Sequence, residues 1–167
     1  MLVKASTMSQ LLEDLRQRAF ESPQQQVFIN VLYTSAFVKK ASSGALKPYG
    51  LTWQQFNAMR ILRGQGDRPA SMRLLQDRML DPQSNASRLV DKLSAKGLVV
   101  RETSTHDRRR VGIALTPEGA GVLAQASAAM TDYLRTVGGG LSDQEMVQLS
   151  DLLDRFRLGL RRERSTQ

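Results

Sequence analysis

Apolar residues recur at helical spacing over most of the chain, but two short segments after residue 97 have a different pattern. Residues 86–93 carry four apolar positions in the i, i+3, i+4, i+7 pattern of one helix face. These positions are Ala86, Leu89, Val90 and Leu93. Residues 98–103 and 111–115 are instead rich in β-forming residues, and the polar segment 104–110 separates them. The pattern predicts a helix followed by a β-hairpin.

Capping residues indicate where this central helix begins and ends. Asp81 is a suitable N-cap, and Pro82 suits the first helical position, where a missing N–H costs nothing. Gly97 predicts the end, because glycine readily adopts the left-handed conformation. The face opposite the apolar stripe carries Ser84, Ser87, Arg88, Asp91, Lys92 and Ala95. Small polar groups and an arginine on an exposed helix face suit the major groove of DNA.

Further helices are expected on both sides of this region. Helical spacing or helix-start signals mark residues 8–20, 22–46, 52–63, 71–80, 116–137 and 142–163. Thr52 with Gln55, and Ser142 with Glu145, have the spacing of capping boxes. The expected fold is mainly α with a small β-hairpin wing, which is a winged helix-turn-helix accompanied by long dimerisation helices.

A chain of 167 residues is expected to form a single domain with a substantial core. Residues 1–21 form an N-terminal extension and residues 51–116 the winged-helix DNA-binding lobe. The long helices of residues 22–47 and 117–163 carry surplus apolar surface. Such helices beside one recognition helix imply dimerisation, because a two-fold dimer doubles the DNA readout.

Composition favours a polyanion partner and excludes several kinds of chemistry. The formal charge is +8, which attracts nucleic acid, although a basic protein without any nucleic-acid role is the alternative interpretation. The chain has no cysteine and one histidine, which excludes disulfides, thiolate catalysis and a zinc site of Cys and His ligands. We find no spacing of metal ligands, no cofactor motif and no nucleophile–base constellation, so we expect no metal, no cofactor and no enzyme.

Membrane insertion and secretion are not expected from the sequence. No apolar run approaches the roughly 20 residues that a transmembrane helix needs. The first 20 residues carry acids and lack a continuous apolar segment, unlike a secretory signal. A cytoplasmic protein is therefore expected.

The central region resembles the MarR family of bacterial transcription regulators. The matching segments are 87–93, 96–99, Arg101, 107–109 and 115–119. Recognition helix, wing signature and following helix cap occur in the order and spacing of that family, and a looser resemblance extends over residues 24–162. The resemblance implies a homodimeric, DNA-binding repressor at a palindromic operator in double-stranded DNA. It also implies that the N-terminal helix and the last two helices form the dimer interface.

Base contacts are expected at the start of the recognition helix. The candidates are Ser84, Asn85, Ser87 and Arg88. Asn85 has the groups to bond adenine, and Arg88 those to bond guanine. Lys92 and Lys96 lie further along the helix, where phosphate contacts are expected. The alternative for Asn85 and the serines is helix-start chemistry, since these side chains also satisfy free backbone N–H groups.

Three arginines, Arg108, Arg109 and Arg110, stand at the tip of the predicted hairpin. Their charges repel one another unless a polyanion compensates them. The family resemblance implies that Asp107 braces the loop by pairing with an arginine, while Arg109 enters the minor groove. Arg108 and Arg110 then contact phosphates or join the bracing pair. A solvated run of charges is the alternative interpretation.

The resemblance further implies an effector, a small aromatic or phenolic acid bound between the dimer helices and the winged-helix lobe. Such binding changes the separation of the two recognition helices. The candidate wall residues are Tyr33, Phe37, Trp53, Phe56 and Arg60. Each of these has a core or surface role as its alternative. An architectural nucleic-acid-binding protein without any ligand response is the alternative function.

Overall fold

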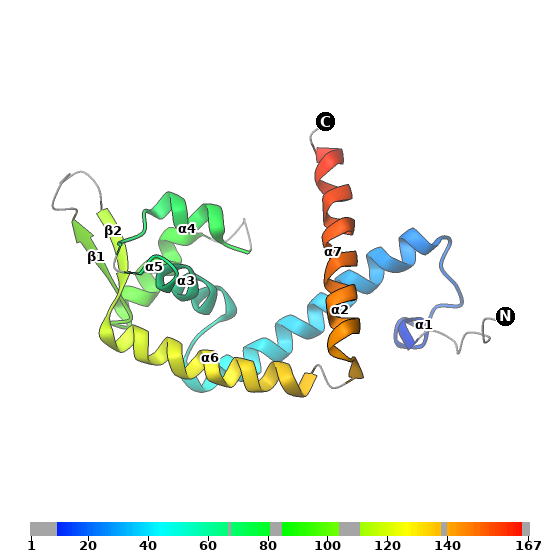
Figure 1. Cartoon of the computed structure of the whole chain (residues 1–167), viewed down its shortest axis with the longest axis horizontal. Helices are drawn as coiled ribbons and strands as arrows, with labels where there is room; N and C mark the ends of the chain where they lie inside the picture. The colour runs from blue at the N-terminus through cyan, green and yellow to red at the C-terminus, as the bar shows by residue number, and fades with distance from the viewer. Residues whose placement is uncertain (1–9, 67, 81–84, 104–110, 138–139, 165–167) are drawn as a thin grey trace. The chain divides into compact units, whose positions relative to one another are not determined.

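The computed structural model describes residues 10–66, 68–80, 85–103, 111–137 and 140–164. In chain order its elements are α1 (Gln10–Leu15), α2 (Pro23–Leu46), the 3-10 turn η1 (Lys47–Tyr49), α3 (Trp53–Arg63), α4 (Met72–Arg78), α5 (Ala86–Ala95), β1 (Val99–Thr103), β2 (Val111–Leu115), α6 (Pro117–Val137) and α7 (Asp143–Arg164) (Figure 1). The mainly α fold with a small hairpin is confirmed. The chain divides into two compact units, Met1–Gly44 and Ala45–Gln167, and each is described by itself.

The predicted capping boxes set the starts of two helices. At α3, the Thr52 hydroxyl accepts from the Gln55 backbone N–H at 3.2 Å, and the Gln55 side chain accepts from the Thr52 N–H at 3.0 Å. At α7, the Ser142 backbone N–H donates to the Glu145 carboxylate at 2.8 Å. Hydrogen bonds from the Ser142 hydroxyl and backbone hold the pKa of Glu145 below its ordinary value. Local sequence alone therefore fixes where these helices begin.

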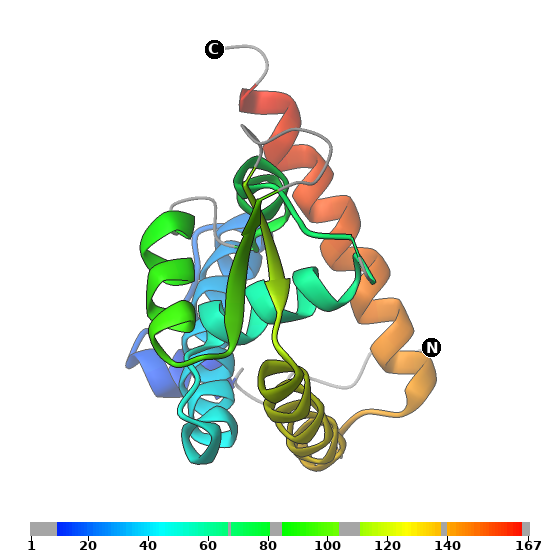
Figure 2. The ribbon, with the colours of Figure 1, turned by 90° about the vertical axis from the view of Figure 1, so that its left-hand side faces the viewer.

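The hairpin pairs β1 with β2 in antiparallel register, from Val99 opposite Leu115 to Thr103 opposite Val111. Figure 2 shows the two strands side by side, with β2 leading directly into α6. Ala70 adds an isolated bridge that the sequence pattern did not predict. The Ala70 and Ile113 backbones exchange two hydrogen bonds of 2.8 Å each. This bridge attaches the chain ahead of α4 to the hairpin.

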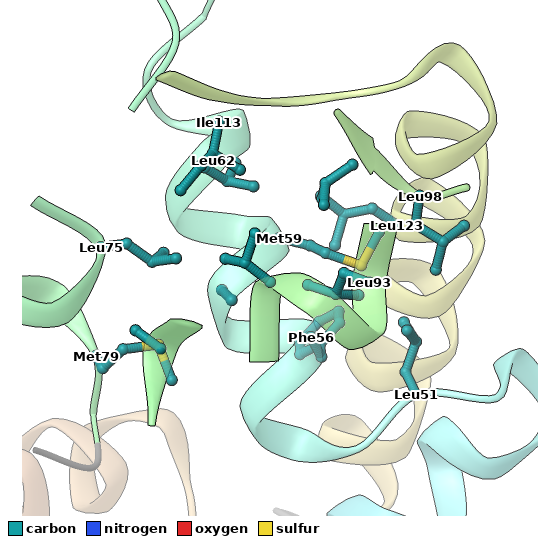
Figure 3. Packing of buried hydrophobic residues seen from close by; sticks show 14 of the residues in the cluster. Leu51, Phe56, Met59, Leu62, Leu75, Met79, Leu93, Leu98, Ile113 and Leu123 are labelled. Atoms are coloured by element: carbon teal, nitrogen blue, oxygen red, sulfur yellow. The ribbon is translucent and has the colours of Figure 1, made fainter. Parts of the chain in front are cut away.

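One hydrophobic core lies at the centre of the second unit. Figure 3 shows side chains of α3, α4, α5, α6 and the hairpin converging there. The largest fully buried side chains are Phe56, Leu46, Met59, Leu75, Leu93, Ile113, Leu123 and Val90. Because these residues come from every element around α5, the core fixes that helix against the rest of the unit.

The first unit contains α1 and most of α2. Helix α1 is shorter than the predicted stretch of residues 8–20, because Arg16 takes a left-handed φ of 53° directly after Leu15. Leu11 on α1 is buried. Helix α2 leaves many large apolar side chains exposed, namely Val27, Phe28, Leu32, Phe37 and Val38. These side chains have no cover within a single chain in the described residues.

Candidate nucleic-acid interface

Helix α5 begins later than its sequence suggests. The prediction of an Asp81 cap with Pro82 at the first position is wrong, because the helix starts at Ala86 with Asn85 as its N-cap. The Asn85 side-chain oxygen accepts a hydrogen bond from the Arg88 backbone N–H at 3.0 Å. Asparagine caps a helix as well as aspartate does, and Asn85 directly precedes the apolar stripe. Asn85 therefore performs the helix-start role with one lone pair of its side-chain oxygen, and its exposed side-chain NH₂ is left without a partner among the described residues.

The end of α5 is fixed by a glycine, as predicted. Gly97 has a φ of 70°, and its N–H donates to the Ser94 carbonyl at 2.9 Å. The Leu98 N–H donates to the Leu93 carbonyl at 3.0 Å, which completes a Schellman motif. The motif turns the chain from α5 directly into β1, so the recognition helix and the wing strand are rigidly joined.

The two faces of α5 separate buried apolar residues from exposed polar ones. Ala86, Val90 and Leu93 are each at most 1% exposed. The exposed side carries four of the residues predicted to bind DNA, which are Asn85, Ser87, Arg88 and Lys92. The structure thus brings these four together on one outward surface of a helix whose other face is fixed in the core.

A polar groove of about 440 Å³ separates the exposed side of α5 from the start of α3. We call it the α3–α5 groove. It is lined by Thr52, Gln54, Gln55, Asn85, Arg88, Leu89 and Lys92. The sequence placed Arg88 and Lys92 on α5, but nothing in the pattern indicated that α3 would supply the facing wall.

Two contacts attach α5 to its neighbours and were not predicted. The Arg101 guanidinium on β1 pairs with the Asp91 carboxylate at 2.5 Å. An exposed pair of this kind adds little stability, but it neutralises an acid on a face otherwise suited to DNA. The Lys96 ammonium donates to the Gly50 carbonyl. Lys96, for which the sequence predicts a phosphate contact, uses one of its three N–H donors in this bond and stays exposed, so that contact remains a prediction.

Five of the predicted DNA-binding residues lie outside the described residues. These are Ser84, Asp107, Arg108, Arg109 and Arg110. Their roles at the helix start and in the wing remain predictions from the sequence.

The predicted ligand-wall residues belong to two different units. In the first unit, Tyr33 and Phe37 have ring centroids 4.9 Å apart and meet edge to face. They border a pocket of about 390 Å³ between α1 and α2. Its other lining residues are Gln10, Leu11, Asp14, Asn30 and Thr34. Among the described lining residues, the Asp14 carboxylate is the one carboxyl group, and none is a Lys, Arg or His.

In the second unit, the remaining three wall candidates cluster on α3. Phe56 is only 2% exposed and belongs to the hydrophobic core, which is one of the two alternative roles that the sequence allowed for it. The Trp53 ring centroid lies 5.9 Å from that of Phe56, and the Arg60 guanidinium carbon lies 5.9 Å from the same ring. Trp53 also packs against the core, which leaves Arg60 as the exposed member of the cluster.

Neither a metal centre nor a membrane span is found in the described residues. No three acidic or histidine side chains there gather closely enough to hold a metal ion. None of the helices within the described ranges combines the length and the apolar character that crossing a membrane requires.

Comparison with known proteins finds the same family that the motifs resemble. A sequence profile described as the MarR family matches residues 49–110. A Thauera aromatica protein, named as a transcriptional regulatory protein for the hcr operon, is 38% identical over 74 residues. That match covers 44% of this chain and 45% of the relative's length. The HTH-type transcriptional regulator YsmB of Bacillus subtilis is 28% identical over 114 residues, covering 68% of this chain and 77% of YsmB.

Solved structures share the architecture over most of the chain. The crystal structure of CouR from Rhodococcus jostii RHA1, bound to p-coumaroyl-CoA, has a TM-score of 0.69 and 27% identity. The alignment covers 82% of this chain and 95% of CouR. The likeness therefore extends beyond the winged-helix lobe to the flanking helices.

Proposed function

We propose that this chain, which belongs to the MarR family of transcriptional regulators, is a homodimeric repressor of a palindromic operator. It acts in the cytoplasm by binding alone, without catalysis. The observation that carries the proposal is the exposed side of α5, where Asn85, Ser87, Arg88 and Lys92 gather on a helix fixed by the core. A rigid helix with these donors suits base readout in the major groove.

The exposed apolar surface of the long helices supports the homodimer. On α2 five large apolar side chains are exposed, and on α7 Leu149, Leu152 and Leu160 are between 44% and 57% exposed. A single soluble chain rarely leaves so much apolar surface in contact with water. A second copy burying the same helices around a two-fold axis would cover both patches and hold two recognition helices at a fixed separation.

An effector that releases the operator completes the proposed mechanism. The relative CouR was crystallised with p-coumaroyl-CoA, whose acyl group is aromatic. In this chain the Tyr33–Phe37 ring pair and its pocket offer an aromatic ligand a stacking surface. A small aromatic acid is the expected ligand class from the family, but the Asp14 carboxylate in this pocket repels an acid and favours a neutral phenol. Binding that favours a different separation of the recognition helices would release the DNA.

The wing supplies the test of this function. Arg109→Ala is expected to weaken binding to the DNA upstream of the chain's own gene, because the protein loses a positive charge that attracts the phosphates of the duplex. The plot of log affinity against log salt should flatten by about one counterion, as expected for one lost DNA contact. Fluorescence anisotropy at four or more salt concentrations measures both changes.

Arg135→Ala is the matched control, because it also removes one arginine. Arg135 lies in the last turn of α6 and pairs with Asp132 at 3.3 Å. Equal affinity of wild type and Arg109→Ala at every salt concentration would refute the wing assignment. Uniform coating of the DNA in a footprint, with no protected palindrome, would favour the architectural alternative.

A further inference from the structure

The α3–α5 groove presents hydrogen-bond donors and positive charge. Arg88 and Lys92 are exposed on its α5 wall, and none of its described lining residues is an Asp or Glu. The nearby Asp91 carboxylate is occupied by Arg101, so it does not neutralise these two cations. Two like charges one helical turn apart repel each other, and an anion between them relieves that repulsion.

Hydrogen-bond accounting shows which groove atoms are left for a ligand. The Thr52 hydroxyl and the Gln55 side-chain oxygen are used in the capping box of α3. The Asn85 side-chain oxygen is used in capping α5. The Gln54 side chain, by contrast, has no hydrogen-bond partner in the part of the chain that the structure describes, although it is half-buried. The donors left over are the side-chain NH₂ groups of Gln54, Gln55 and Asn85, the Thr52 O–H and the two cations.

These remaining groups fit an oxyanion. An amide NH₂, a guanidinium and an ammonium are all donors, and together they match the several acceptor oxygens of a phosphate or a carboxylate. Gln54 approaches from α3, whereas Arg88 and Lys92 approach from α5, so a bound oxyanion would be held from two walls.

We propose that the α3–α5 groove binds a phosphodiester of the DNA backbone, and that Gln54 on α3 is a DNA contact outside the helix-turn-helix formed by α4 and α5. The proposal rests on the proposed function, because Arg88 and Lys92 lie on the face that α5 turns to the duplex. A backbone phosphate in this groove would set the depth and angle at which α5 enters the major groove, since phosphate contacts fix register and orientation. A free carboxylate shares the same chemistry and is distinguished by the experiment.

Gln54→Glu tests the contact without unfolding the helix. Gln54 is in the first turn of α3, where an acid is favoured by the helix dipole. The new carboxylate should repel the phosphate, and we expect affinity to fall about tenfold, as for a lost hydrogen bond to a charged group. The loss should be equal for the duplex from the chain's own upstream region and for a random duplex, because every sequence carries the same phosphates.

The control is Gln125→Glu, the same change on the exposed face of α6. It should lower affinity far less, and circular dichroism melting should show both variants folded. Equal DNA affinities of the two variants would overturn the groove assignment. The proposed function would still hold in that case, provided that the wild-type protein binds the upstream duplex. A loss confined to the upstream duplex would assign Gln54 to base readout and also overturn the proposal. If Gln54→Glu bound DNA as wild type does but lost the displacement by millimolar sodium benzoate that wild type shows, the groove would be assigned to a free acid instead.

Discussion

Replacing Gly119 by alanine is expected to destabilise the second unit by about 3 kcal/mol, at the upper end of overpacking costs. A Cβ at this position would lie 1.9 Å from the Leu98 carbonyl oxygen. That atom belongs to the backbone, so no side-chain rotation relieves the clash. The Thr116 N–H donates to the same carbonyl at 3.2 Å, and the Thr116 hydroxyl caps Gly119 at 2.9 Å. Moving α6 away would therefore break the junction between hairpin and helix.

Gly121→Ala provides the matched control on the same helix. Nothing lies within 4 Å of a Cβ built at Gly121. Because alanine is the better helix former, this variant should gain about 0.5–1 kcal/mol. Urea denaturation followed by circular dichroism compares the two free energies of unfolding. If Gly119→Ala proved as stable as Gly121→Ala, the close approach of α6 to Leu98 would be wrong.

Leu152→Glu is expected to convert the dimer to monomers and to abolish operator binding under ordinary assay conditions. Leu152 on α7 is 57% exposed in the single chain, so a glutamate there is solvated in the monomer but buried and unpaired in the proposed dimer. A monomer binds only one half-site, and losing the second linked contact should cost about a hundredfold or more in apparent affinity. Analytical ultracentrifugation reports the mass, and fluorescence anisotropy reports the affinity.

A second acid on α7 separates a charge effect from a loss of apolar contact. Gln144→Glu adds the same negative charge in the first turn, on the side opposite the apolar face. This variant should remain dimeric and bind DNA nearly as wild type does. If Leu152→Glu stayed dimeric at micromolar concentration, α7 would not form the interface that we propose.

The sequence predicted those parts of the fold that depend on neighbouring residues. The capping boxes at Thr52 and Ser142 formed as expected, because each needs only side chains three residues apart. The hairpin was predicted for the same reason, since β-forming runs and a polar turn lie next to each other. The start of α5 was misplaced because Asp81 and Asn85 are both good caps, and only the folded chain shows which one is used.

Features that join distant segments could not be predicted in the same way. The Ala70–Ile113 bridge involves a single residue 43 positions away along the chain, too short to leave an alternating pattern. The sequence indicates only a surface role for Gln54, whereas in the folded chain it lines the same groove as Arg88 and Lys92. The contact of Lys96 with the Gly50 carbonyl likewise joins positions far apart along the chain, so the sequence pattern does not indicate it. Tertiary packing decides the role of each of these side chains.

Selection of bound sequences from random double-stranded DNA is the most direct test of whether a homodimer of this chain binds one duplex with both recognition helices. We expect an inverted repeat whose half-site centres lie about 10 base pairs apart, or a multiple of that spacing, because each α5 of a two-fold dimer enters a major groove on the same side of the duplex. Recovery of unrelated sequences, or of a single undivided half-site bound by one chain, would contradict it.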